Sequence, residues 1–203
     1  MSFPDFSASD AHIQWQRYCD LGWYHDDLGV WLDISRMHVN AADLQQLQPR
    51  MDKAFSAMQE LEAGAIANPD EQRQVGHYWL RTPELAPGSE LQQHISREID
   101  LIAAFGRDVI NGTIKAPNGE PFTDVLWIGI GGSGLGPALM IKALQNPGEG
   151  LPFHFFDNVD PNGMSNVLAG LEGRLDRTLV VTVSKSGGTP EPHIGMEQAR
   201  HRL

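Results

Sequence analysis

The first half of the chain carries hydrophobic side chains at steps of three or four residues, the spacing that places them on one face of a helix. Residues 11–24 have such a stripe, and Asn40 is a suitable N-cap for a longer one over residues 41–61. A third stripe follows Ser89, which can cap it. A short apolar run at residues 31–34 favours a strand. The pattern therefore predicts a mostly helical region.

The pattern changes after residues 115–121, whose prolines, asparagine and glycine are typical of a turn. Beyond this turn come three short, mainly apolar runs at residues 125–130, 153–156 and 179–183, and the first of them is continuous. Each run is followed by a loop and then by a helical stretch, or the start of one. This order predicts an α/β fold in which helices cover both faces of a parallel sheet.

Two regions follow from these patterns. We predict a helical N-terminal region over residues 1–115 and the first part of a three-layer αβα domain over residues 122–203. Three strands are few, because sheets usually have five or six. The chain also stops inside a predicted helix, without the glycine or proline that commonly follows one. We therefore expect an incomplete sheet here, in the N-terminal part of a longer protein.

The net charge of the chain argues against two classes of binding partner. Its 203 residues include 15 Lys and Arg against 26 Asp and Glu, a formal net charge of −11. So acidic a chain is expected to bind no nucleic acid, which requires a basic surface, and to dock on no anionic membrane. A small anion is not excluded, since a local group of backbone N–H donors can hold one inside an acidic protein.

A single cysteine, Cys19, excludes an internal disulfide and a cysteine-rich metal site. The eight histidines form none of the paired spacings typical of metal ligands, so we expect no metal. The first 20 residues lack the apolar segment of a signal peptide. The longest apolar runs are far shorter than the roughly 20 residues that span a bilayer. These features predict a cytoplasmic protein.

The first candidate for chemistry is the glycine loop at residues 129–134, which matches G-x-G-x-x-G between a predicted strand and a predicted helix. Its glycines allow close approach of an anion, and the helix N-terminus offers N–H groups. A tight turn without a ligand is the simplest alternative. A dinucleotide site is another, and it requires an acidic residue about 20 residues on. Asp157 lies 28 residues after Gly129, so this alternative stays open.

The second candidate is the hydroxyl loop at residues 184–189, where Ser184, Lys185, Ser186 and Thr189 bring three hydroxyls and an ammonium to one turn. Such groups donate hydrogen bonds to phosphate oxygens. The alternative is a helix cap, with Thr189 at the N-cap and proline in the first turn. A cap explains Thr189 but not the other three residues. The segment is not a Walker A loop, and a dinucleotide site has no need of it.

At these positions the sequence resembles a known family. Ser184-x-Ser186-Gly187-x-Thr189 is similar to the phosphosugar loop of sugar isomerase (SIS) domains. Residues 125–137 and 182–191 together resemble the glucose-6-phosphate isomerase family, and residues 68–81 are similar to a further segment of it. The chain departs from many members at Gly187-Gly188, where they have an aromatic residue and a threonine.

The resemblance implies a SIS-type fold and an aldose–ketose isomerisation of glucose 6-phosphate and fructose 6-phosphate through a cis-enediol, without metal or redox cofactor. The positions that match the family's phosphate site are Ser184, Lys185, Ser186 and Thr189, and those that line the sugar are Gly132 and Ser133. The family's proton-transfer residues match no position up to 203, so we expect this chain to be inactive by itself. The family also implies a homodimer at full length.

Two alternatives of other classes remain from the sequence. A non-catalytic SIS-type module would bind a sugar phosphate as a regulatory ligand through the same hydroxyl loop. An NAD-dependent oxidoreductase would use the glycine loop alone. The first alternative differs from the isomerase in lacking a catalytic base, and the second leaves the hydroxyl loop unexplained.

Overall fold

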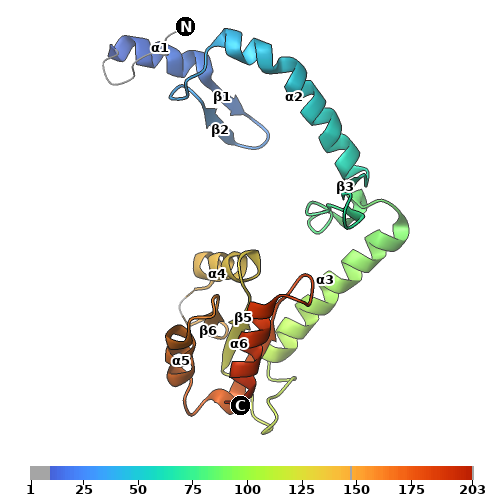
Figure 1. Ribbon diagram of the computed structural model, residues 1–203, viewed down its shortest axis with the longest axis vertical. Coiled ribbons are helices and arrows are strands. Elements are labelled where there is room, and N and C mark those ends of the chain that lie inside the picture. Colours follow the sequence, from blue (N-terminus) through green and yellow to red (C-terminus); the bar gives the residue numbers. More distant parts are fainter. Residues whose placement is uncertain (1–9, 147, 203) are drawn as a thin grey trace. The chain divides into compact units, whose positions relative to one another are not determined.

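The computed structural model describes residues 10–146 and 148–202 and divides the chain into two compact units. The first unit runs to Gln93 and the second begins at His94, so the boundary falls within helix α3 (Ser89–Ile110) (Figure 1). The first unit is built from helices and short hairpins, and the second from a sheet covered by helices. Within the described residues, no helix is both long enough and apolar enough to cross a membrane.

The first unit confirms the predicted helical N-terminal region and adds two antiparallel hairpins, β1–β2 and β3–β4. Its elements are α1 (Ala11–Leu21), β1 (Gly22–His25), β2 (Val30–Asp33), α2 (Ala41–Glu62), β3 (Ile66–Asn68), β4 (Arg73–Gln74), the 3₁₀ helix η1 (Pro83–Leu85) and the start of α3. Ser89 is itself the first residue of α3, so it does not stand at the N-cap position predicted from the sequence.

The first helix ends earlier than its apolar stripe predicts. Residues 22–25 leave the helix and form β1, where Trp23 lies opposite Leu32 and Tyr24 opposite Trp31. The rings of Tyr24 and Trp31 are 5.8 Å apart between centroids. Aromatic residues favour strands and stabilise cross-strand pairs, so the hairpin outweighs one further helical turn.

The predicted N-cap of α2 is confirmed. Asn40 Oδ1 accepts hydrogen bonds from the backbone N–H groups of Ala42 and Asp43, at 2.8 and 3.1 Å. The Asp43 carboxylate accepts in return from the N–H of Asn40, at 2.9 Å. This reciprocal pair is a capping box, which satisfies donors that the first turn of a helix leaves without partners.

The second unit contains the predicted parallel sheet, with strand order β6-β5-β7. Its elements are the remainder of α3, β5 (Asp124–Ile128), α4 (Gly132–Leu144), β6 (Phe153–Phe156), α5 (Pro161–Gly170), the 3₁₀ helix η2 (Leu175–Arg177), β7 (Thr178–Thr182) and α6 (Pro190–Arg200). The strand of this sheet that comes first in the chain, β5, is therefore its central strand. The α/β fold predicted from the three apolar runs is confirmed.

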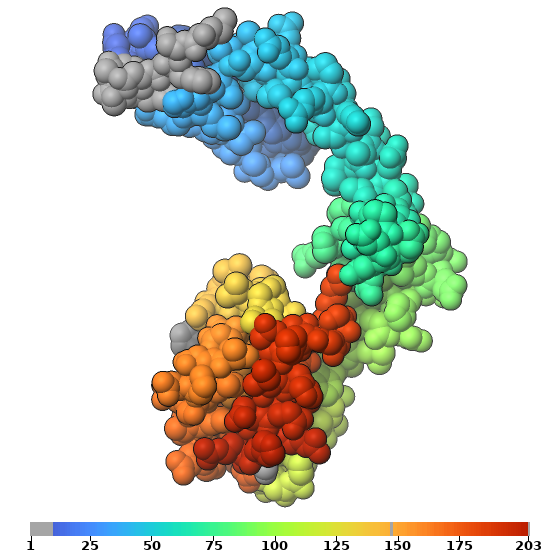
Figure 2. Space-filling view, in the orientation of Figure 1, coloured from blue at the N-terminus to red at the C-terminus, as the bar shows by residue number. Residues whose placement is uncertain are grey.

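The two faces of this sheet pack against different helices. Leu126 and Ile128 of β5 belong to the main buried cluster, with Phe156 and with residues of α5 and α6. These two helices lie side by side on that face (Figure 2). Val125 and Trp127 alternate to the other face, where they line an apolar cavity of about 510 Å³ together with α3. Because the second unit begins at His94, within α3, the predicted boundary at residues 115–121 lies inside this unit.

A buried carboxylate ties the amino end of the sheet together. The Asp124 side chain is only 2% exposed and accepts hydrogen bonds from His154 Nε2 at 2.8 Å and Arg174 Nε at 3.0 Å. Burial raises the pKa of Asp124, but the hydrogen bonds from His154 and Arg174 outweigh it and hold the pKa below its ordinary value. This cluster lies at the opposite end of β5 from the glycine loop, and its role is structural.

Candidate functional site

The glycine loop and the hydroxyl loop lie side by side because their strands are neighbours in the sheet. The glycine loop follows β5 and the hydroxyl loop follows β7, and Ile128 pairs with Thr182 at the carboxyl end of these strands. One residue further, the N–H of Val183 donates to the Ile128 carbonyl at 2.8 Å. Ligands in open parallel sheets bind outside the carboxyl ends of the strands, so both candidate loops lie where a ligand is expected.

Close packing and backbone conformation account for three of the four glycines in the glycine loop. A Cβ at Gly129 would lie 2.7 Å from the Ser133 carbonyl oxygen, and one at Gly134 would lie 2.4 Å from the Gly129 carbonyl oxygen. Gly131 has a φ of +57°, a conformation that L side chains rarely adopt. A Cβ at Gly132, in contrast, would meet no described atom within 4 Å apart from its chain neighbours and the backbone of its own helix. A tight turn alone therefore leaves Gly132 unexplained.

In the hydroxyl loop, three side-chain oxygens converge. Ser184 Oγ donates to Thr189 Oγ1 at 3.2 Å, and Ser186 Oγ lies 3.4 Å from the same oxygen. Thr189 stands at the N-cap of α6, as the capping alternative predicts. Its side chain nevertheless makes no capping hydrogen bond to a described residue, so capping does not explain the hydroxyl.

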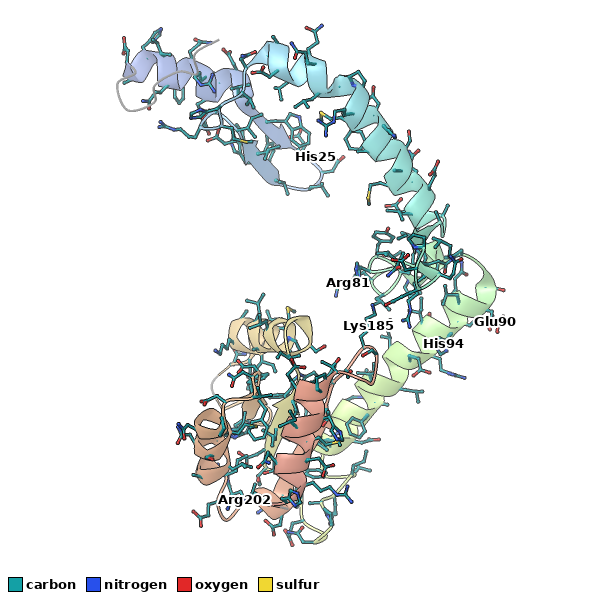
Figure 3. All side chains as sticks on the ribbon, viewed as in Figure 1. His25, Arg81, Glu90, His94, Lys185 and Arg202 are labelled. Atoms are coloured by element: carbon teal, nitrogen blue, oxygen red, sulfur yellow. The ribbon has the colours of Figure 1, made fainter. Side chains whose placement is uncertain are left out.

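Backbone amides join these hydroxyls. The N–H of Gly187 donates to Ser184 Oγ at 3.0 Å, and the N–H of Gly188 donates to Ser186 Oγ at 3.2 Å. Gly187 has a φ of +72°, which a residue with a side chain adopts only at a cost. Lys185 adds its ammonium to the same loop, between β7 and α6 (Figure 3). The amino end of α6 adds the positive end of a helix dipole. The loop thus gathers the donors that an anion requires.

The acidic residue that a dinucleotide site would need lies beside the glycine turn. Asp157 directly follows β6, and its Cβ is 3.5 Å from where a Cβ of Gly134 would be. Its carboxylate is exposed and accepts a hydrogen bond from Asn158 Nδ2 at 2.9 Å. A metal centre has less support, since the described residues contain no cluster of three His, Cys, Asp or Glu side chains that could hold an ion.

One contact at this site was not apparent from the sequence. The indole Nε1 of Trp127 donates to the backbone carbonyl of Ser133 at 2.7 Å, which links β5 to the first turn of α4. In the sequence, Trp127 is simply one member of a continuous apolar run. The sequence did contain one sign of this contact. Pro137 has no N–H, so the carbonyl of Ser133, four residues earlier, lacks its usual donor within the helix and needs another.

The fold and the two loops define an α/β protein with a group of hydrogen-bond donors at the carboxyl edge of its parallel sheet. A family model described as phosphoglucose isomerase matches residues 33–203. The chain belongs to the phosphoglucose isomerase family, as the resemblance of its loops predicts.

Several curated relatives support this assignment. A protein of Synechococcus sp. (strain CC9605) named glucose-6-phosphate isomerase is 96% identical over all 203 residues, which make up 38% of that relative. Proteins of the same name from Prochlorococcus marinus strains MIT 9313 and MIT 9211 are 73% and 53% identical, over 100% and 99% of this chain and 37% and 38% of the relatives. The chain therefore spans less than two-fifths of the length of these relatives.

Proposed function

We propose that this chain is part of an aldose–ketose isomerase that interconverts glucose 6-phosphate and fructose 6-phosphate, and that the hydroxyl loop holds the phosphate. The observation that carries the proposal is the convergence of two serine hydroxyls on one threonine: Ser184 Oγ and Ser186 Oγ lie 3.2 and 3.4 Å from Thr189 Oγ1. Membership of the phosphoglucose isomerase family supports the choice of a phosphorylated hexose as substrate.

A phosphate group matches this loop in charge and in hydrogen bonding. Its terminal oxygens only accept hydrogen bonds, whereas the three hydroxyls, the Lys185 ammonium and the amides of Gly187 and Gly188 can all donate. The serine and threonine hydroxyls now bond to one another, and rotation about the side chains redirects them to a ligand. Hydrogen bonds to a charged group are worth about 1.5–3 kcal/mol each, more than bonds between neutral groups.

The glycine loop is assigned to the sugar. Gly132 and Ser133 lie at the start of α4, which follows β5, and β5 is the sheet neighbour of the strand that precedes the hydroxyl loop. The open space beside Gly132 admits a ligand where a side chain would obstruct it. With the phosphate on the hydroxyl loop, the carbon chain of the hexose extends across the carboxyl ends of β7 and β5.

The chemistry of the proposed reaction needs no redox cofactor. A proton leaves C2 of the open-chain aldose and another is added at C1, through a cis-enediol, so the product has the same oxidation level overall. We place none of the proton-transfer residues within residues 1–203 and assign them to the rest of the full-length protein. We further propose that this protein is a cytoplasmic homodimer, as membership of the family suggests.

The test uses the full-length protein, in which the chain is extended to the length of its relatives. Ser186→Ala should weaken binding of fructose 6-phosphate by about 1–3 kcal/mol and leave binding of unphosphorylated fructose unchanged, because the lost hydroxyl donates to the phosphate. The matched control is Ser165→Ala, which removes an exposed hydroxyl from α5. An equal loss for both sugars would contradict the phosphate assignment.

Two further measurements separate the isomerase from the alternatives. Turnover of glucose 6-phosphate by the full-length protein supports an enzyme, whereas tight binding without turnover would favour a regulatory module. Saturable enhancement of NADH fluorescence at micromolar concentration would instead favour a dinucleotide site at the glycine loop and Asp157.

A further inference from the structure

Trp127 connects the central strand to the glycine loop. Its indole N–H donates to the carbonyl oxygen of Ser133, six residues further along the chain, at 2.7 Å. Ser133 is the second residue of α4, so the bond fastens the first turn of this helix to the sheet.

The reason that Ser133 accepts this bond lies four residues later. In a regular α-helix the Ser133 carbonyl would accept from the backbone N–H of residue 137. Residue 137 is a proline inside α4, which has no N–H to donate. The Trp127 indole thus supplies a donor in place of the amide that the helix lacks.

The same carbonyl is confined from a second side. A Cβ at Gly129 would lie only 2.7 Å from the Ser133 oxygen, so the turn brings this oxygen close against the backbone of the strand end. The Ser133 carbonyl is therefore fixed between the backbone at Gly129 and the indole of Trp127. Any loss of the indole donor leaves a partly buried carbonyl without compensation and frees the turn to shift.

We propose that Trp127 is a positioning residue for the sugar site: its indole N–H replaces the donor missing at Pro137, and it thereby holds Gly132 and Ser133 in place for the ligand. The inference deepens the proposed function and rests on it. It assigns to Trp127 a part in ligand affinity, although the residue lies in the strand and acts through the Ser133 carbonyl.

The Trp127 ring also packs against apolar side chains, so the effect of its hydrogen bond must be separated from the effect of its packing. Its ring lies 6.4 Å from that of Phe153 between centroids, and both side chains line the apolar cavity beneath α3. Trp127→Phe removes the N–H donor together with some volume. Phe153→Leu serves as the matched control, because it loosens the packing around Trp127 and retains the donor.

Replacing Pro137 should restore the donor that Trp127→Phe removes. In the double variant Trp127→Phe/Pro137→Ala, residue 137 regains an N–H that can donate to Ser133 within the helix. In full-length protein, we expect Trp127→Phe to raise the Kd for fructose 6-phosphate about three- to tenfold. The Kd of the double variant should return to within about twofold of the wild-type value. The single variants Phe153→Leu and Pro137→Ala should also have a Kd within about twofold of the wild type, since both retain the Trp127 donor for the Ser133 carbonyl.

Any of three results would overturn the proposal. If Trp127→Phe binds fructose 6-phosphate as the wild type does, or if the double variant binds as weakly as the single one, Trp127 only fills space. A loss in Phe153→Leu as large as that in Trp127→Phe would point to the same conclusion.

A second readout needs no ligand and distinguishes this inference from the proposed function. The amides of Gly134 and Leu135 donate to the Gly131 carbonyl at 3.1 and 2.8 Å, so their hydrogen exchange reports on the turn. Exchange should be about three- to tenfold faster in Trp127→Phe and restored in the double variant. If the wild type binds no sugar phosphate, the proposed function fails, and unchanged exchange would independently overturn the role of Trp127.

Discussion

The hydroxyl oxygens of Ser184 and Thr189 lie 3.2 Å apart, although Thr189 occupies the N-cap position of α6, where its hydroxyl would ordinarily satisfy the helix. An N-cap oxygen ordinarily accepts from the N–H of the second or third helical residue, and the third residue here is Pro192, which has no N–H. This leaves the Thr189 hydroxyl available to the loop and links the local geometry of a helix start to the proposed phosphate site.

Thr189 therefore gives a direct test of the loop. Thr189→Val keeps the shape of the side chain but removes the hydroxyl, and we expect it to weaken fructose 6-phosphate binding by about 1.5–3 kcal/mol in full-length protein. Thr189→Ser retains the hydroxyl and should bind within a few-fold of the wild type. Calorimetric titration measures both, and similar affinities for the two variants would contradict the phosphate contact.

The glycine loop offers a paired prediction on stability and binding. Gly134→Ala should lower the free energy of unfolding by about 1–3 kcal/mol, because its Cβ would lie 2.4 Å from the Gly129 carbonyl oxygen. Gly132→Ala should unfold at the wild-type temperature, since beyond its chain neighbours and its own helix backbone no described atom would lie within 4 Å of its Cβ. It should nevertheless bind fructose 6-phosphate more weakly than the wild type.

Thermal unfolding and ligand titration of the two alanine variants check this pair. Wild-type affinity in Gly132→Ala would show that the open space beside this residue does not receive the sugar.

Asp124 predicts a pH dependence of stability. Its pKa is held below the ordinary value of 3.8, so its contribution is fully present above that value and is lost as the pH falls through the lower folded-state pKa. Asp124→Asn should cost about 1–3 kcal/mol at neutral pH, where the carboxylate accepts from His154 and Arg174. Urea unfolding of both proteins between neutral and strongly acidic pH should show this difference shrinking only at the acid end. A difference that stays constant would indicate that the carboxylate charge is unimportant.

Residues 1–203 alone should not isomerise glucose 6-phosphate. Proton transfer between C1 and C2 needs a base within about 2.6–3.2 Å of the proton, and such a group contributes roughly 10²–10⁴-fold to the rate. The carboxylate next to the hydroxyl loop in the chain is Glu191, which lies in the first turn of α6 and is best placed to interact with the helix dipole. A coupled assay on the purified chain, free of host isomerase, measures the rate. Turnover at the full-length rate would make Glu191 the first residue to substitute.

The sequence predicted the parallel sheet closely because its strands are short runs of mainly apolar residues. The run at residues 153–156 matches β6 throughout, and the run at 179–183 is shifted by one residue from β7. The run at residues 31–34 predicted a strand and is shifted by one residue from β2, but its partner β1 was not predicted, because Trp23 and Tyr24 also fit the stripe of the preceding helix. Cross-strand pairing with Trp31 and Leu32 decides between a further helical turn and a strand at Trp23 and Tyr24. A local sequence pattern does not show such pairing.

The candidate site was predicted as residue types but not as contacts. The sequence placed Ser184, Ser186 and Thr189 on one loop, and a helix cap left only the Thr189 hydroxyl explained. Whether Thr189 caps α6 could be decided only once the hydrogen bonds of its side chain were known. The bond from Trp127 to Ser133 joins an apolar position to a backbone carbonyl, and neither group is marked as functional by its type. Side-chain direction, rather than composition, carried the missing information.

The strand order β6-β5-β7 also has a consequence for synthesis. The central strand β5 emerges from the ribosome before either of its partners, with both edges unpaired. Its neighbour β7, which brings the hydroxyl loop beside the glycine loop, emerges last of the three. Assembly of the two halves of the site therefore waits for a long-range pairing step, and variants that slow this step should expose β5 to aggregation in the nascent chain.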